Sequence, residues 1–187
     1  MAFHLAIPFP GPVYLIKHST GIMKNTILVF GVMLFLHYKA FATWSIIMID
    51  PETKEIGIAG ASCSYNCYGI GEIVPGMGAV IVQAMSNNEA RDKGIEMILA
   101  EASPELIILT LRDPAFDPEK QQYAVVTVKY FDNPRTYTGN ATKSYNRSLT
   151  ANGVSVQGNT LTNENELELI LAAVQKGRND FLHNYAC

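Results

Sequence analysis

Residues 43–62 carry the clearest strand pattern in the chain. Residues 43–50 (TWSIIMID) and 55–62 (EIGIAGAS) are rich in β-branched residues or alternate between apolar and small residues, which predicts two strands. The residues between them, 51–54 (PETK), favour a turn because proline presets the backbone angle that a turn needs. Together these segments predict an antiparallel β-hairpin.

The length of the turn fixes the register of this hairpin. A four-residue connection pairs Ile47 with Ile58 and Thr43 with Ser62. Directly opposed side chains of an antiparallel pair lie on one face, about 5 Å apart. Thr43, Ser45 and Ser62 are therefore predicted to cluster on one face, at the open end of the hairpin.

After residue 62 the pattern alternates between loops, strands and helices. A glycine-rich loop is predicted at 63–76, and strands at 78–85, 121–128, 135–138 and 153–157. Three helices are predicted: from a Ser86/Glu89 capping box to about residue 101, from Ser103-Pro104 to Asp113, and from an Asn163/Glu166 cap to a stop at Gly177. This order predicts an α+β fold in which sheets are covered by helices.

The N-terminal region has the pattern of a secretory signal peptide. Lys24 precedes an apolar run at 27–36 (ILVFGVMLFL), and Ala40-Phe41-Ala42 provides a small-x-small cleavage site. Residues 23–42 are therefore predicted to direct export to the periplasm or the medium, and residues 1–22 to be a non-native upstream extension. A buried strand or helix, or a membrane anchor, is the alternative, but a ten-residue run is short for a membrane span.

Cleavage after Ala42 would make Thr43 the first residue of the mature protein. An N-terminal threonine carries a hydroxyl and an α-amine on one residue, and the amine is a ready general base for that hydroxyl. The alternative is that Thr43 simply starts a strand. Ser45 takes its place if cleavage falls two residues later.

Composition narrows the class of protein. The 187 residues are 48% hydrophobic and 17% charged, which excludes overall disorder, and the net charge of −3 argues against a nucleic-acid partner. No membrane anchor is expected after cleavage, and a homo-oligomer is left open. Gly69-Ile70-Gly71 lacks the full dinucleotide fingerprint, so no cofactor is expected.

Several segments in order resemble one bacterial family. They are Thr43-Trp-Ser-Ile-Ile, residues 57–62 (GIAGAS), Val74-Pro-Gly, Gln83-Ala and residues 155–159 (SVQGN). They are similar to the domain of unknown function 1028, which is placed among the N-terminal nucleophile (Ntn) hydrolases with a four-layer αββα sandwich. The resemblance runs from Thr43 to about Asn184. It implies a hydrolase that cleaves an amide bond of a small molecule or peptide, with Thr43 as nucleophile. A non-catalytic binding or structural module on the same fold is the alternative.

Other candidate site residues keep two interpretations each. Ser62 hydrogen-bonds Thr43, or is an ordinary strand end; Asn159 supplies an oxyanion donor, or is a turn residue in the left-handed region. Ser45 and Gln83 are candidate substrate-binding residues, because the Gln83 amide ends a core strand and needs a partner.

Two further expectations concern the cysteines and the C-terminal end of the chain. Cys63 and Cys67 form a disulfide in an oxidising compartment or stay free thiols, and a metal site is not expected because His183 is the only histidine after residue 42. Members of the family usually continue past a helix like the one at Phe181 into a Gly-Gly-Asp segment and further strands. The domain at 43–187 is therefore expected to be C-terminally incomplete and marginally stable.

Overall fold

The computed structural model describes residues 42–185, apart from residues 65, 66, 68 and 164. They lie in one compact unit that spans residues 40–187. The predictions for residues 1–41 lie outside this part. Among the described residues, no helix combines the length and apolar character needed to cross a membrane.

The first sheet contains both strands of the predicted hairpin. Its strand order is β2-β1-β8-β7, and every neighbouring pair is antiparallel. The strands are β1 (Thr43–Ile49), β2 (Ile56–Ser62), β7 (Arg147–Ala151) and β8 (Val154–Asn159). The β1–β2 register pairs Thr43 with Ser62 and Ile47 with Ile58, which confirms the predicted register.

The second sheet is also antiparallel, in the order β3-β4-β5-β6. Its strands are β3 (Gly71–Val74), β4 (Gly78–Ala84), β5 (Gln121–Thr127) and β6 (Arg135–Thr138). The described helices are α2 (Asn88–Leu99), α3 (Pro104–Leu111) and α4 (Glu166–Tyr185), with short 3₁₀ turns η1 (Pro114–Phe116) and η2 (Pro118–Lys120) before β5.

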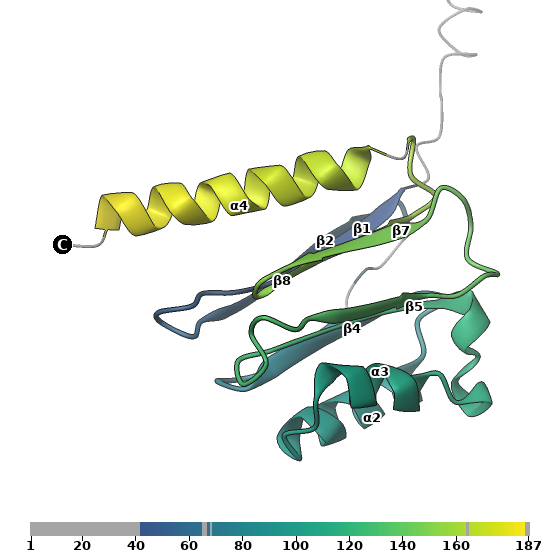
Figure 1. Ribbon diagram of the computed structural model, residues 1–187. Coiled ribbons are helices and arrows are strands. Elements are labelled where there is room, and N and C mark those ends of the chain that lie inside the picture. The colour runs from purple at the N-terminus through teal and green to yellow at the C-terminus, as the bar shows by residue number, and fades with distance from the viewer. Residues whose placement is uncertain (1–41, 65–66, 68, 164, 186–187) are drawn as a thin grey trace, which may run out of the picture. The chain divides into compact units, whose positions relative to one another are not determined.

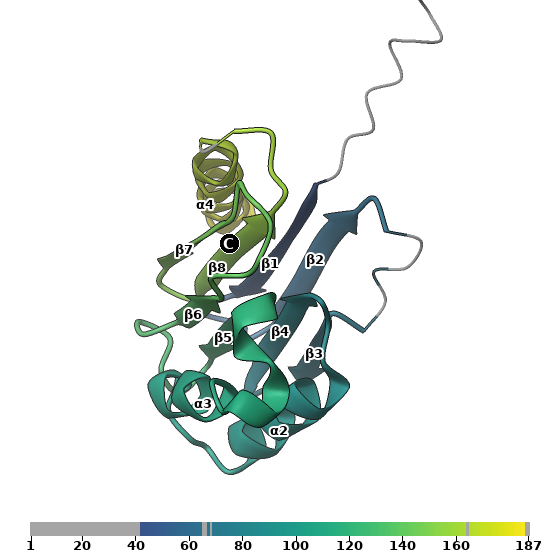
Figure 2. The same ribbon diagram turned by 90° about the vertical axis from the view of Figure 1, so that its right-hand side faces the viewer.

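The elements stack in four layers, helix on sheet on sheet on helix (Figure 1). One apolar cluster joins α2 and α3 to the outer face of β4 and β5, and another joins α4 to the outer face of β1, β8 and β7. A third lies between the sheets and includes Ile47, Ile49, Ile81 and Val126. Figure 2 shows α2 and α3 lying over the second sheet. The predicted α+β sandwich of helix-covered sheets is confirmed.

Several boundaries differ from the sequence prediction. Helix α2 is capped by Asn87, whose Oδ1 accepts from Ala90 N at 3.0 Å, and not by Ser86, whose φ of 53° lies in the left-handed region. Helix α4 continues through Gly177, because an isolated glycine weakens a helix without stopping it. Strand β3 lies inside the predicted loop, and β7 was not predicted at all.

The layer between the two sheets changes character along its length. Near the β1–β2 turn it is apolar, with Ile47 and Ile49 of β1 packed against Ala79 and Ile81 of β4. Towards the start of β1 the same faces carry Ser45 and Gln83, which hydrogen-bond at 2.6 Å. The start of β1 and the end of β4 therefore lie at the same, polar end of the sandwich.

Candidate functional site

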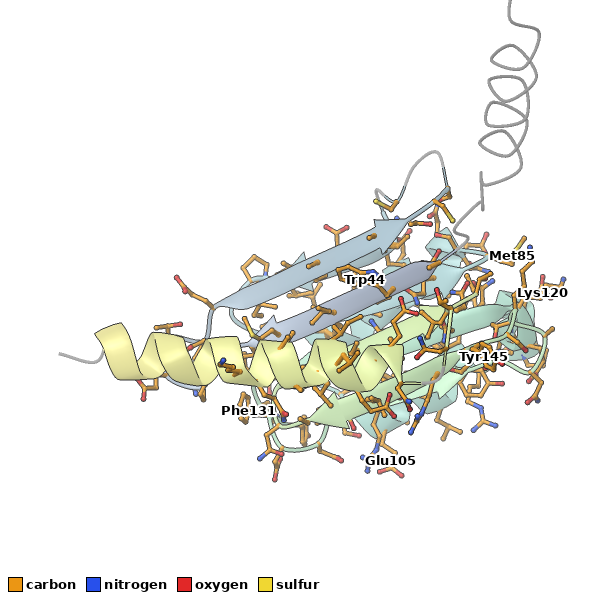
Figure 3. The ribbon with its side chains drawn as sticks, turned by 90° about the horizontal axis from the view of Figure 1, so that it is seen from above. Trp44, Met85, Glu105, Lys120, Phe131 and Tyr145 are labelled. Atoms are coloured by element: carbon orange, nitrogen blue, oxygen red, sulfur yellow. The ribbon has the colours of Figure 1, made fainter. Side chains whose placement is uncertain are left out.

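Side chains along β1 point alternately to the two faces of the sheet, and this determines the direction of the Thr43 side chain. Trp44 and Ile46 belong to the cluster under α4, whereas Ile47 and Ile49 face the second sheet. Since side chains of a strand alternate between faces, Thr43 and Ser45 share the inner face with Ile47. Trp44, labelled in Figure 3, lies on β1 next to Thr43. Thr43 thus stands at the polar end of the space between the sheets.

Hydroxyl groups gather around Thr43. Its Oγ1 lies 2.8 Å from Ser62 Oγ, at the distance of a hydroxyl–hydroxyl hydrogen bond. Ser62 Oγ in turn lies 2.9 Å from Ser64 Oγ and accepts a hydrogen bond from Ser64 N at 3.2 Å. The predicted contact between Thr43 and Ser62 is present, and Ser64 extends it into a chain of three hydroxyls.

A network of buried amides lies directly behind this cluster. Gln157 Nε2 donates to Ser45 Oγ at 2.7 Å, and Ser45 Oγ donates to Gln83 Oε1 at 2.6 Å. Gln83 Nε2 donates to Gln122 Oε1 at 2.9 Å, so the chain of bonds runs from β8 and β1 across to β4 and β5. The predicted need of the Gln83 amide for a partner is met on both its oxygen and its nitrogen.

Asn159 joins the same network from the end of β8. Its Nδ2 donates to Gln122 Oε1 at 2.9 Å, and Gln122 Nε2 donates to the carbonyl of Gly158 at 2.9 Å. Asn159 lies in the strand opposite Thr43, so it is not the turn residue that one interpretation assumed. The residue in the left-handed region is its neighbour Thr160, with φ of 54°.

The network binds the two sheets and carries no charge. Each of its side chains is a neutral hydroxyl or amide that is 7% exposed or less. Gln157 Oε1 is buried, and among the described residues it has no hydrogen-bond partner. Within that part of the chain no three His, Cys, Asp or Glu side chains gather closely enough to hold a metal ion. The hydrogen-bond partner of Thr43, the hydroxyl of Ser62, is neutral as well.

Gln122, Gln157 and Ser64 were missed by sequence reasoning. Residues 154–159 (VSVQGN) alternate apolar and polar residues, which is typical of a strand with one face in water. Here both faces are buried, because α4 covers one and the second sheet covers the other. The signal was present as the polar set Ser155, Gln157 and Asn159, but only the four-layer arrangement places that set inside the protein.

The family comparison matches this domain from its first strand onwards. A family model matches residues 43–184, so its match begins at Thr43. The chain belongs to the Family of unknown function (DUF1028). A comparison with curated proteins found no match.

A crystal structure of another DUF1028 protein has a similar fold. Protein SPO2555 from Silicibacter pomeroyi is 21% identical to this chain, with a TM-score of 0.66. The match covers 71% of this chain and 58% of that protein, so this chain spans less than two thirds of its length. At this identity the similarity supports the fold of the DUF1028 domain.

Cys63 of the DUF1028 domain lies beside the hydroxyl cluster, between Ser62 and Ser64. Cys63 and Cys67 are both free thiols in the structure, which is the second of the two sequence interpretations. Cys63 N donates to the carbonyl of Ala42 at 3.3 Å, and Cys63 Sγ lies 3.6 Å from the same oxygen. The β1–β2 ladder thus extends to Ala42, the residue before Thr43.

A large apolar groove lies at the other end of the same hairpin. It encloses about 1200 Å³ and is lined by the turn residues 53–55 together with Ile46, Met48, Ile58 and Val174. Its lining extends from the β1–β2 turn as far as Ile46, in the middle of β1, and does not include Thr43. The domain therefore has a polar site at one end of the hairpin and an apolar groove at the other.

Proposed function

We propose that this chain is an exported Ntn-type hydrolase on an Ntn-like αββα fold, and that Thr43 is its nucleophile. The observation that carries the proposal is the position of Thr43 Oγ1, 2.8 Å from Ser62 Oγ at the polar end of the space between the sheets. Removal of residues 1–42 would give Thr43 a free α-amine. The match of the family model from residue 43 supports that starting point.

The chemistry follows from the neutral surroundings of Thr43. The α-amine, with an ordinary pKa of about 7.7–8.0, accepts the hydroxyl proton as Oγ1 attacks the carbonyl carbon of an amide substrate. The bond to the amide nitrogen then breaks, and the proton leaves with the amine product. A water molecule hydrolyses the resulting ester on Thr43 and restores the hydroxyl. Since the hydrogen-bond partner of Thr43 Oγ1 is the neutral hydroxyl of Ser62, we assign the role of base to the amine of Thr43 itself.

Two neighbours have supporting roles in this mechanism. Ser62, held by Ser64, fixes the rotamer of Thr43 through their hydroxyl hydrogen bond. Asn159 lies directly opposite Thr43, and its Nδ2 carries two N–H groups, one of which is committed to Gln122. We assign the other to the oxyanion that forms on the substrate carbonyl. Ser45 and Gln83 do not contact the substrate. They support the site by holding the amide network beneath it.

Activity-based labelling tests the nucleophile. The full chain, expressed with export, is treated with an electrophilic β-lactone, and the modified peptide is mapped by mass spectrometry. The proposal requires label on Thr43 and its loss in Thr43→Ala, with partial labelling of Thr43→Ser. With a substrate in hand, Thr43→Ala should lower the rate at least about 100-fold. Thr150→Ala, on an exposed position of β7, is the matched control.

Failure of that labelling favours the second candidate, a non-catalytic binding module. The apolar groove at the β1–β2 turn is the observation in its favour. Gly57 lines this groove, and a Cβ added there meets no atom within 4 Å. The Cβ of Gly57→Leu therefore enters open space, and the larger side chain is introduced to narrow the groove. Binding of the apolar dye 1-anilinonaphthalene-8-sulfonate to the full chain should fall in this variant and stay unchanged in Thr43→Ala.

A further inference from the structure

A second, polar pocket lies at the end of the second sheet. It encloses about 470 Å³ between residues 85–89, which lead into the first turn of α2, and three residues around the start of β5, namely Asp117, Lys120 and Gln121. Met85 and Lys120 lie at the end of the domain where β1 begins (Figure 3). We call it the β4–α2 pocket. Its volume is typical of a site for a small molecule.

Gln121, one of the residues that line this pocket, carries an unsatisfied hydrogen-bond acceptor. The residue is only 3% exposed. Gln121 Oε1 is buried, and it has no hydrogen-bond partner among the residues that the structure describes. A buried amide oxygen without a donor destabilises a fold by about 1–3 kcal/mol. An N–H or O–H group of a bound molecule would satisfy it.

The walls of the pocket are fixed before anything binds. Asn87 Nδ2 donates to the carbonyl of Phe116 at 3.2 Å, which ties the start of α2 to η1. Three residues around the pocket that are not glycine, Ala84, Ser86 and Asp117, adopt φ of 77°, 53° and 52°. Such angles are unfavourable for alanine and serine and persist only where the surroundings hold them. The shape is therefore preformed.

The charged residues that line the pocket determine which charge a bound molecule should carry. Lys120 Nζ lies 3.3 Å from Asp117 Oδ2, so these two charges offset each other. Glu89, in the first turn of α2, adds a further carboxylate. The lining is therefore net negative, and the acceptor of Gln121 lies within it. This combination favours cationic or neutral N–H donors over carboxylates and phosphates.

We propose that the β4–α2 pocket binds a small molecule through a nitrogen that carries two or three N–H groups, a primary amide or an ammonium, held by Gln121 Oε1. This binding is separate from chemistry at Thr43, whose side chain faces the space between the two sheets. Gln121 and Gln122 are neighbours on β5 and point to opposite faces, so one serves the pocket and the other serves the amide network.

NMR titration of the full, ¹⁵N-labelled chain tests the proposal. The probes are propionamide for the amide, methylammonium for the ammonium, glycinamide for both, and sodium acetate as the anionic control. We expect saturable shifts of the backbone signals of residues 86–90 and 121 with glycinamide and with one of the two simpler probes, which identifies the donor. Shifts elsewhere, equal shifts with acetate, or no shift up to 50 mM would overturn the proposal.

Substitutions link the binding to Gln121. Gln121→Leu removes the acceptor at nearly constant size and should weaken glycinamide binding about tenfold, whereas Gln121→Glu keeps an acceptor and should retain it. If Gln121→Leu does not fold, Glu89→Gln provides the test: at this exposed position it should weaken the binding of glycinamide, and of methylammonium where that is the simpler probe that binds, and should leave propionamide binding unchanged. Unaltered affinity in every variant contradicts the proposal. Thr43→Ala should bind glycinamide normally, which separates this result from the fate of the hydrolase proposal.

Discussion

Gln122 and Asn159 join the two sheets through one amide–amide hydrogen bond. Asn159 Nδ2 of β8 donates to Gln122 Oε1 of β5 at 2.9 Å, and the same oxygen accepts from Gln83 Nε2 of β4. Gln122 is fully buried. The polar end of the sandwich is thus held by a side chain that three strands share.

Removal of the Gln122 amide should therefore destabilise the domain strongly. Gln122→Leu leaves Gln83 Nε2, Asn159 Nδ2 and the Gly158 carbonyl without their partner, and each such loss costs about 1–3 kcal/mol. We expect the free energy of unfolding in urea to fall by at least about 3 kcal/mol. The exposed Thr150→Ala on β7 should change it by less than about 0.5 kcal/mol.

A double-mutant cycle measures the coupling free energy between Gln122 and Asn159. Gln122→Leu combined with Asn159→Ala should cost less than the sum of the single changes, because the bond between them is lost only once. Strictly additive free energies would contradict a direct coupling between Gln122 and Asn159.

Gly153 should not tolerate a side chain. It has φ of 67° in the β7–β8 turn, and a Cβ there would lie 2.0 Å from the ring of Phe131. Gly153→Ala should lower the free energy of unfolding by about 2 kcal/mol or more. Gly57→Ala is the control, because its Cβ meets nothing within 4 Å. Equal melting temperatures of the two variants would refute this interpretation.

The pH dependence of stability should include a contribution from Glu119. Tyr137 Oη donates to its Oε1 at 2.7 Å and Asn140 N donates to its Oε2 at 2.9 Å, and these bonds lower the pKa of the Glu119 carboxyl. A lowered folded-state pKa stabilises the fold above the unfolded pKa of about 4.3, and this stabilisation is lost as the pH falls through the folded value.

Tyr137→Phe removes the larger cause of that shift. Urea unfolding between pH 3 and pH 7 should therefore show a shallower loss of stability on acidification in Tyr137→Phe than in the parent chain. In Glu119→Gln the contribution should be absent. An identical slope in all three proteins would exclude Glu119 as a source of the acid sensitivity.

The exported protein should begin at Thr43. The expectation rests on Lys24, the apolar run at 27–36 and the small residues around Ala42. N-terminal sequencing of the secreted product measures it directly. A start at Met1, at Met23 or beyond Ser45 would rule out Thr43 as an N-terminal nucleophile and with it the proposed hydrolase.

Oxidation should link Cys63 to Cys67 if the protein is exported. They are free thiols in the structure, and four positions of chain separate them. In protein secreted to an oxidising compartment, thiol counting under denaturing, non-reducing conditions should find Cys187 alone. Reaction of all three cysteines would show that the pair stays reduced.

The sequence predicts the β1–β2 hairpin and the contact between Thr43 and Ser62 well, because both depend on local rules. Turn length determines which residues oppose each other, and this alone brings Thr43 to Ser62. Ser103 and Pro104 begin α3 as predicted, since cap and first-turn preferences act over a few residues. Asn87 and not Ser86 caps α2, and because both residue types suit that position the sequence alone does not choose between them.

The amide network depends on contacts between distant segments, so local rules do not reach it. Gln157 meets Ser45 across 112 positions of chain, and Gln122 meets Asn159 across 37. A strand with polar residues on one face ordinarily turns that face to water. Strand β8 turns it inward, and only the packing of the two sheets reveals this. The unpartnered acceptor of Gln121 is likewise a property of the assembled fold.

The change from apolar to polar along the space between the sheets has a consequence for mutational tolerance. At the apolar end, Ile47, Ile81 and Val126 are held by shape and size, so exchanges among aliphatic residues should leave a working core. At the polar end the buried hydroxyl and amide side chains hydrogen-bond one another, and an exchange of one leaves another without its partner. A saturation library selected for folded protein should therefore retain variety at one end of the sandwich and little at the other. The invariant end would mark the surroundings of Thr43 before any substrate is known.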